Sequence, residues 1–287
     1  MDPLQTVVFI DGRNFRYNLQ AFRFHGAGGP DPDRYYRLDE KHFLWRDFFL
    51  GILAKFNEAT GLTHRLMRVY WYSAESMRPF QVSDRLVNKV LNRYSTQFPD
   101  LTSDLVVRLA RDWYAEERRY FEQTQEKVFE NIQRNVDFLE FKYVGEYVVR
   151  PFDPYAFERN QDGTYRYLGT REGEKGVDVG IAVDMVSKMP NYDVGILVSG
   201  DADFIPAVRY LKDNLKLVYQ FSLAQGIPPR ITYLSPWLIG RVDCFQAYDE
   251  LELLEQHLNR QASIPPAILQ AIDERMEHLR EIASGSP

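Results

Sequence analysis

The sequence contains a single cysteine, Cys244, and only five histidines in 287 residues. One cysteine cannot form an internal disulfide, which fits a reducing compartment. Zinc is not expected either, because structural and catalytic zinc sites need clustered imidazole and thiolate ligands. No apolar run reaches about 18 residues, so no membrane-spanning helix is expected, and the chain start lacks the positive region of a signal peptide. We therefore expect a cytoplasmic protein with no membrane contact.

A strong positive charge is also lacking, since the formal net charge is −6 at pH 7. Any binding of nucleic acid must therefore depend on a local basic patch rather than on the overall field. The composition, with 45% hydrophobic and 26% charged residues, is that of a globular protein. The length allows one large domain or two small ones.

Short apolar runs predict buried strands, and the run at 7–10 is expected to be the central one. Further strands are expected at 67–72, 196–198, 215–221 and 231–234. A hairpin-like excursion is expected over 138–150 and 164–168, with Asp162 and Gly163 as a turn. Helical patterns occupy 44–56, much of 73–135, the end of 174–186 and most of 240–282, where Pro265 and Pro266 mark a break. Residues 25–33 are expected to form a loop. Together these patterns predict an α/β fold with a mainly parallel sheet.

Four aspartates fall where strands are expected to pass into helices. Asp11 follows the first strand, Asp178 opens a helix, and Asp201 and Asp203 follow the strand at 196–198. Such positions converge on one crevice when their strands are neighbours in a parallel sheet. Carboxylates about 4 Å apart repel by several kcal/mol at an effective dielectric near 20, and a divalent cation relieves that repulsion. Mg²⁺ prefers such oxygen ligands and is often shared with substrate phosphate.

Each of these acids also has an ordinary structural explanation. Asp203 and Asp178 could cap the helices that follow them, and Asp11 with Gly12 is a common turn pair. Asp184 lies six residues beyond Asp178, about 600° around a helix, so the two side chains do not share a face. The argument for a site depends on the acids occurring together, at three separate junctions.

Three blocks of sequence resemble the signatures of the NYN domain family, the LabA-like or DUF88 branch of the PIN-like ribonucleases. The blocks are Phe9-Ile10-Asp11-Gly12-Arg13-Asn14, Lys175-Gly176-Val177-Asp178 with Ala182-Val183-Asp184-Met185, and Leu197-Val198-Ser199-Gly200-Asp201-Ala202-Asp203-Phe204. They occur in the family's order, and the resemblance covers roughly Thr6 to Leu234.

The resemblance implies a Rossmann-like, three-layer PIN fold with a nuclease site that uses Mg²⁺ or Mn²⁺. By position, the acidic metal-binding and catalytic residues would be Asp11, Asp178, Asp201 and Asp203. Asn14 and Ser199 match supporting polar residues, and Asp184 matches a recurring acid. The implied nuclease domain spans 1–245 with a helical insertion at about 74–136, followed by a C-terminal helical extension at 246–287.

A nuclease also needs positive charge for phosphate. Residues 65–93 contain six basic residues against two acids. Within this stretch Arg85, Lys89 and Arg93 repeat every four residues, which places them on one face of a helix. This face could contact phosphates, although a solvated helix surface is the commoner explanation. Arg13 and Lys175 lie beside the motif acids and could contact or steer substrate.

The leading hypothesis is a metal-dependent endoribonuclease acting on RNA, single-stranded RNA among its substrates. The alternative is a regulatory RNA- or protein-binding module of the same fold without useful turnover, with the insertion or C-terminal helices as surfaces for a protein partner or a second copy. A third hypothesis is a phosphatase acting on a small substrate. Its usual Asp-x-Asp at the first strand is absent here, because Gly12 and Arg13 follow Asp11.

Overall fold

The computed structural model describes residues 2–25, 35–150, 157–167 and 169–285. Two compact units make up the chain. The first contains Met1–Ser73, Asn131–Lys142 and Asp178–Pro287, and the second contains Ala74–Glu130 and Tyr143–Val177. Most of the loop expected at 25–33 lies outside the described residues.

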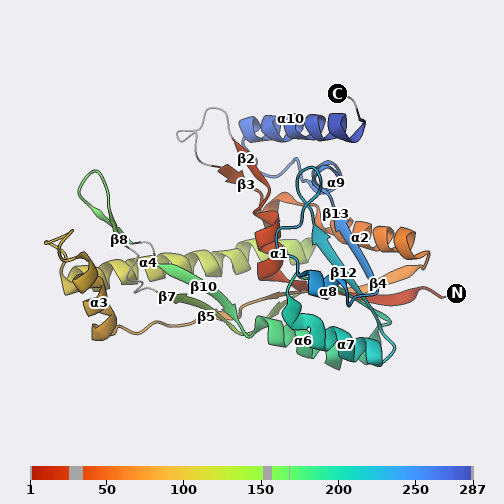
Figure 1. The fold of residues 1–287 in the computed structure, drawn as a ribbon, viewed down its shortest axis with the longest axis horizontal. Coiled ribbons are helices and arrows are strands. Elements are labelled where there is room, and N and C mark those ends of the chain that lie inside the picture. Colours follow the sequence, from red (N-terminus) through yellow and green to blue (C-terminus); the bar gives the residue numbers. More distant parts are fainter. Residues whose placement is uncertain (1, 26–34, 151–156, 168, 286–287) are drawn as a thin grey trace. The chain divides into compact units, whose positions relative to one another are not determined.

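The first unit is built on a six-stranded sheet with the order β13-β12-β11-β1-β4-β6 (Figure 1). The strands are β1 (Leu4–Asp11), β4 (His64–Ser73), β6 (Leu139–Tyr143), β11 (Val194–Val198), β12 (Leu217–Leu223) and β13 (Cys244–Tyr248). β1 pairs in parallel with β4 and β11, and the β11–β12 and β12–β13 pairs are also parallel. Residues 7–10 of β1 are at most 5% exposed, as expected for a strand covered on both faces. The predicted α/β class and the interior position of this strand are confirmed.

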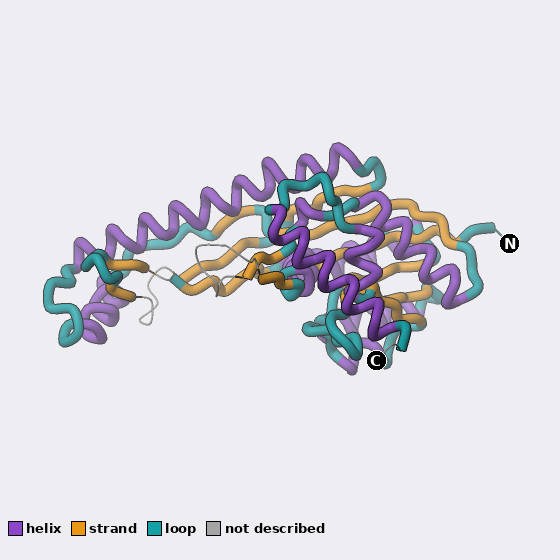
Figure 2. Tube along the Cα trace, turned by 90° about the horizontal axis from the view of Figure 1, so that it is seen from above, coloured by secondary structure: helices purple, strands orange, loops and turns teal. Residues whose placement is uncertain are grey.

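Helices cover both faces of this sheet. On one face, rings of α1 (Gly12–Leu19) and α2 (Trp45–Thr60) pack on β4 and β12, as in the pairs Phe15–Trp71 and Phe56–Tyr219. On the other face, α6 (Val177–Ser187) is joined to β4 by a hydrogen bond from the Tyr72 hydroxyl to Asp184 Oδ2, 2.7 Å long. Because Trp71 and Tyr72 point to opposite faces of β4, the unit has three layers. Figure 2 shows helices lying over the strands.

Further elements complete the first unit. They are β2 (Arg23–His25), β3 (Tyr35–Arg37), η1 (Glu40–His42), η3 (Met189–Asn191), η4 (Ala202–Phe204), α7 (Ile205–Asp213), α8 (Pro236–Ile239), α9 (Glu250–Glu252), η5 (Leu253–His257) and α10 (Pro266–Ala283). No helix in the described part of the chain is long and apolar enough to cross a membrane.

The second unit combines long helices with small sheets. A three-stranded sheet has the order β10-β7-β5, and β8 pairs with β9. The strands are β5 (Ser76–Met77), β7 (Glu146–Arg150), β8 (Phe157–Arg159), β9 (Tyr165–Tyr167) and β10 (Thr170–Lys175). The helices are α3 (Asp84–Tyr94), α4 (Ser103–Gln123) and the π-helical η2 (Thr124–Phe129), with α5 (Glu130–Asn135) following at the boundary of the unit. Val87, Val90 and Tyr94 of α3 pack with Val106 and Ala110 of α4 in a hydrophobic cluster.

Three predictions of secondary structure are wrong in part. No strand forms at 231–234; the position beside β12 is taken by β13, which also interrupts the expected C-terminal helical stretch. The segments 138–150 and 164–168 do not form a hairpin with each other, because β6 joins the large sheet, β7 pairs with β10 and β5, and β9 pairs with β8. Glu174 and Lys175, expected in a loop, lie in β10. The helices at 44–56 and after Pro265 are confirmed, and so is the turn at Asp162 and Gly163.

Candidate active site

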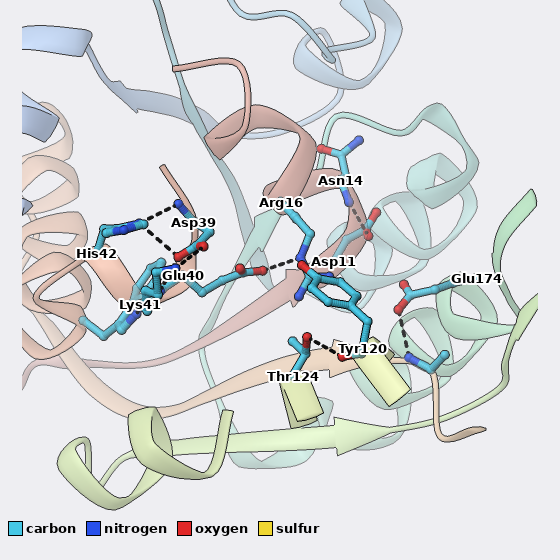
Figure 3. A network of polar contacts seen from close by, with 12 residues as sticks. Asp11, Asn14, Arg16, Asp39, Glu40, Lys41, His42, Tyr120, Thr124 and Glu174 are labelled. Atoms are coloured by element: carbon cyan, nitrogen blue, oxygen red, sulfur yellow. Dashed lines mark hydrogen bonds and ion pairs between the residues drawn. The ribbon is translucent and has the colours of Figure 1, made fainter. Parts of the chain in front are cut away.

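Asp11 ends β1 and at the same time caps α1. Its Oδ1 accepts a hydrogen bond from the Asn14 backbone N–H at 3.0 Å (Figure 3), and its Oδ2 accepts one from the Ser199 hydroxyl at 2.8 Å. The residue is only 5% exposed. Burial of a carboxylate is tolerated when both oxygens have donors, so Asp11 is held in one position by its own helix and by the neighbouring strand.

Ser199 lies beside Asp11 because the strands are in register, with Ile10 opposite Val198. Besides donating to Asp11, the Ser199 Oγ accepts a hydrogen bond from the Asp201 backbone N–H at 3.2 Å. One hydroxyl thus links the acid after β1 to the loop that carries Asp201. This confirms that Asp11 and Asp201 follow neighbouring parallel strands, where ligands bind in open α/β sheets.

The loop after β11 is also fixed by its backbone. Asn14 Oδ1 accepts a hydrogen bond from the Gly200 N–H at 3.1 Å, and the Gly200 carbonyl accepts one from the Ser235 N–H at 2.8 Å. A Cβ on Gly200 would lie 1.8 Å from the Tyr233 carbonyl oxygen, so only glycine fits this position. The tight turn therefore depends on the absence of a side chain.

The capping roles differ from those expected. Asp201, half-buried, is the residue that caps η4, since its Oδ1 accepts a hydrogen bond from the Asp203 N–H at 2.9 Å. Asp203 is exposed in the first turn of η4, and α7 has no side-chain cap. Asp178 lies inside the first turn of α6, which begins at Val177, and it is exposed. Capping is thus the structural role of Asp11 and Asp201, not of Asp203.

Asp184 contacts β4 and its own helix. Its Oδ2 accepts a hydrogen bond from Tyr72 and its Oδ1 forms an ion pair with Lys188, both at 2.7 Å. Tyr72 is paired with Asp11 in the β1–β4 register. Burial, followed by the hydrogen bond with Asp184, raises the pKa of Tyr72, which stays protonated and donating. Asp184 therefore positions α6 against β4 beside the site.

Two further residues support the site and were missed by the sequence reasoning, Tyr72 and Gln220. Gln220 is completely buried on β12, and its Nε2 donates to the Ser199 carbonyl oxygen at 2.7 Å. A long polar side chain within a strand that is mainly apolar was the available signal. On the other side of α1, Arg16 Nε donates to the buried Glu40 at 2.5 Å, which anchors the helix that carries Asn14 (Figure 3).

The basic residues expected to contact substrate are distributed over both units. Arg13 lies in the first turn of α1, with its guanidinium 5.4 Å from the centre of the Tyr17 ring. Arg85, Lys89 and Arg93 are exposed on α3, and Lys175 is exposed at the end of β10, all in the second unit.

The chemistry of the donor set fits Mg²⁺ or Mn²⁺, because the acids at the strand ends offer only hard oxygen ligands. Among the described residues, however, no three carboxylate, imidazole or thiolate side chains lie close enough together to hold a metal ion. Hydrogen bonds connect Asp11 with the Asp201 backbone through the Ser199 hydroxyl. A cation there would therefore depend on one or two of these carboxylates, with the other oxygens coming from water and substrate phosphate.

No curated protein matches the chain. A solved structure of a protein of unknown function from Vibrio parahaemolyticus RIMD 2210633 is similar, with 18% sequence identity, a TM-score of 0.41, and coverage of 86% of this chain and 94% of that chain. The family model of the NYN domain matches residues 113–232, which include Asp178, Ser199, Asp201 and Asp203. Residues 113–232 are therefore similar to the NYN domain, which defines a family of PIN-like nucleases.

Proposed function

We propose that the chain is an endoribonuclease that hydrolyses RNA phosphodiester bonds with Mg²⁺ or Mn²⁺. The observation that carries the proposal is the link from Asp11 through the Ser199 hydroxyl to the Asp201 loop, at the carboxyl ends of adjacent parallel strands. A pair of acids at this point of an α/β sheet is suited to bind a cation together with a phosphate.

Asp11 and Asp201 would hold the cation, with Asp178 and Asp203 as further acids and Asn14 and Ser199 as supports. Each oxygen of Asp11 accepts a hydrogen bond, and these two bonds fix the direction of the carboxylate. When bound, Mg²⁺ or Mn²⁺ supplies activation of water and stabilisation of the charge that develops on the phosphate. Arg13 would contact the phosphate close to the acids.

The second candidate function is an RNA-binding module that turns over slowly or not at all. The observation that favours it is that the four acids form no group of three close carboxylates among the described residues. This module predicts RNA binding that survives neutralisation of the acids and no cleavage above background.

The test is cleavage of a labelled RNA by the full chain with Mg²⁺, with Mn²⁺ and with EDTA, together with calorimetric titration of Mn²⁺. We expect Asp11→Asn to lower cleavage by about a thousandfold, equivalent to about 4 kcal/mol in the barrier, and to weaken Mn²⁺ binding. Asparagine has the same shape as aspartate and can accept the Asn14 N–H bond, so the variant should fold. Equal cleavage by the variant and the parent chain would refute the proposal, and RNA binding without any cleavage would favour the second candidate.

A further inference from the structure

Three large aromatic side chains of the first unit are exposed near the acidic loop. Tyr17, Tyr233 and Trp237 are 42%, 46% and 74% exposed, whereas Trp45 and Trp71 are 4% and 0% exposed. Large aromatic rings stabilise a fold mainly through the apolar area that they bury. A group of exposed rings beside a candidate site is therefore a candidate for contact with a ligand.

These rings are next to the proposed site in the structure. Tyr17 lies on α1, one turn beyond Arg13, and its ring centre is 5.6 Å from that of Tyr233. The Tyr233 backbone lies against Gly200, which directly precedes Asp201. Trp237 is on α8, which contacts η4, the short helix capped by Asp201.

The segment that carries Tyr233 is held in place before any ligand binds. Gln225 and Arg230 exchange backbone hydrogen bonds of 2.8 and 2.7 Å, and Glu250 accepts one from the Gly226 N–H at 2.9 Å. Ser235 is fixed to Gly200 as described above. Rings held in position by the fold lose little conformational freedom on binding, which favours affinity.

Positive charge accompanies the rings. Arg13 lies over the Tyr17 ring, and Arg230, in the segment that leads to Tyr233, is exposed. Alternating aromatic faces and cations match the chemistry of a single nucleic-acid strand, whose bases stack on rings while its phosphates pair with arginine. The bases of a duplex are already stacked on each other and would not be available.

The geometry points to a base-stacking surface made by Tyr17, Tyr233 and Trp237, with Arg13 and Arg230 at its phosphate contacts. This surface would bind single-stranded RNA next to the acids, and it would select unpaired over paired RNA. The inference rests on the proposed function for the identity of its ligand, and it adds the residues that recognise the strand.

The test measures binding to the full chain in EDTA, where the proposed cleavage is absent. Fluorescence anisotropy would compare a single strand of about twelve nucleotides, an abasic strand of equal length and a duplex. We expect the parent chain to prefer the single strand, and Tyr233→Ala with Trp237→Ala to weaken that binding by about tenfold or more, because stacking contributes substantially per base. Binding of the abasic strand should be unchanged by the substitutions, and Trp237→Phe should restore most of the affinity.

Tyr210→Ala is the matched control. Tyr210 is 49% exposed and lies in the second half of α7, away from η4, so its substitution should leave binding unchanged. Equal binding of the single strand by the double variant and the parent chain would overturn the surface, as would a parent chain that prefers the duplex or binds the abasic strand as tightly. If the surface variants lose binding while Asp11→Asn still cleaves, the stacking surface stands and the proposed catalytic role of Asp11 falls.

Discussion

The junctions that follow β1 and β11 have the same backbone arrangement, but their aspartates differ in burial and in hydrogen bonds. In both, an aspartate caps the next helix, and a neighbouring glycine allows another backbone to come close. A Cβ on Gly12 would lie 2.3 Å from the Tyr72 carbonyl oxygen, and one on Gly200 would lie 1.8 Å from that of Tyr233. The acids themselves differ: Asp11 is buried with a donor on each oxygen, whereas Asp201 is half-buried and accepts one hydrogen bond, from the Asp203 N–H.

This difference assigns separate tasks to the two acids. A buried carboxylate with two donors has a fixed orientation, which is what a ligand of a cation needs if the site is to be preorganised. A half-buried carboxylate on a short helix can adapt to substrate. Asp11 is therefore the rigid one of the two acids, and Asp201 is the one more open to solvent and phosphate.

The largest effect on stability should come from the glycine of the second junction. Gly200→Ala places a methyl group against a backbone oxygen, and we expect it to lower the free energy of unfolding by about 4 kcal/mol, at the extreme of single substitutions. Gly12→Ala should lower the free energy of unfolding by less, because the added Cβ lies farther from the nearest backbone oxygen. Urea denaturation followed by circular dichroism measures both. A Gly200→Ala variant as stable as the parent chain would contradict the close approach to Tyr233.

Activity should distinguish the two acids of the β11 loop. We expect Asp201→Asn to lower RNA cleavage by about a hundredfold, near 2.7 kcal/mol in the barrier, and Asp203→Asn by about tenfold. Asp201 is tied to the Ser199–Asp11 network, whereas Asp203 is exposed and contributes only its backbone N–H to that loop. Single-turnover cleavage with Mn²⁺ measures the two rates, and the reverse order would mean that Asp203 is the nearer ligand.

The Ser199 hydroxyl links the two junctions, because it contacts both Asp11 and the Asp201 backbone. Ser199→Ala leaves the buried Asp11 Oδ2 and the Asp201 N–H without their shared partner. We expect a loss of about 2 kcal/mol in the free energy of unfolding, because a buried charged acceptor loses its donor. Thermal denaturation with and without Mn²⁺ measures this loss and shows how far a cation compensates. An unchanged midpoint in both conditions would show that the link is not important for either junction.

Much of this site could be predicted from local sequence, but its connections could not. The apolar strands and the acids after them are local patterns, so β1, β11 and the positions of Asp11 and Asp201 at the ends of these strands were predicted correctly. The Tyr72–Asp184 and Gln220–Ser199 bonds join residues that are 112 and 21 positions apart, and no local periodicity signals them. The half-buried edge strand β13 lacks the apolar run of a central strand, which is why the last strand was expected at 231–234 instead.

The smallest effect should lie on the other side of β1, where no acid terminates the strand. β4 places Tyr72 beside Asp11, and its hydroxyl binds Asp184 of α6 instead of the site itself. Tyr72→Phe keeps the ring and removes this hydrogen bond, so we expect a loss of about 1 kcal/mol in the free energy of unfolding. Tyr72→Phe should lower the rate of RNA cleavage by less than Ser199→Ala does, because the hydrogen bonds of Asp11 remain. A loss of cleavage as large as that of Asp201→Asn would instead mean that this bond holds α6, with Asp178 in its first turn, in its catalytic position. The rigid part of the site would then extend across three strands rather than two.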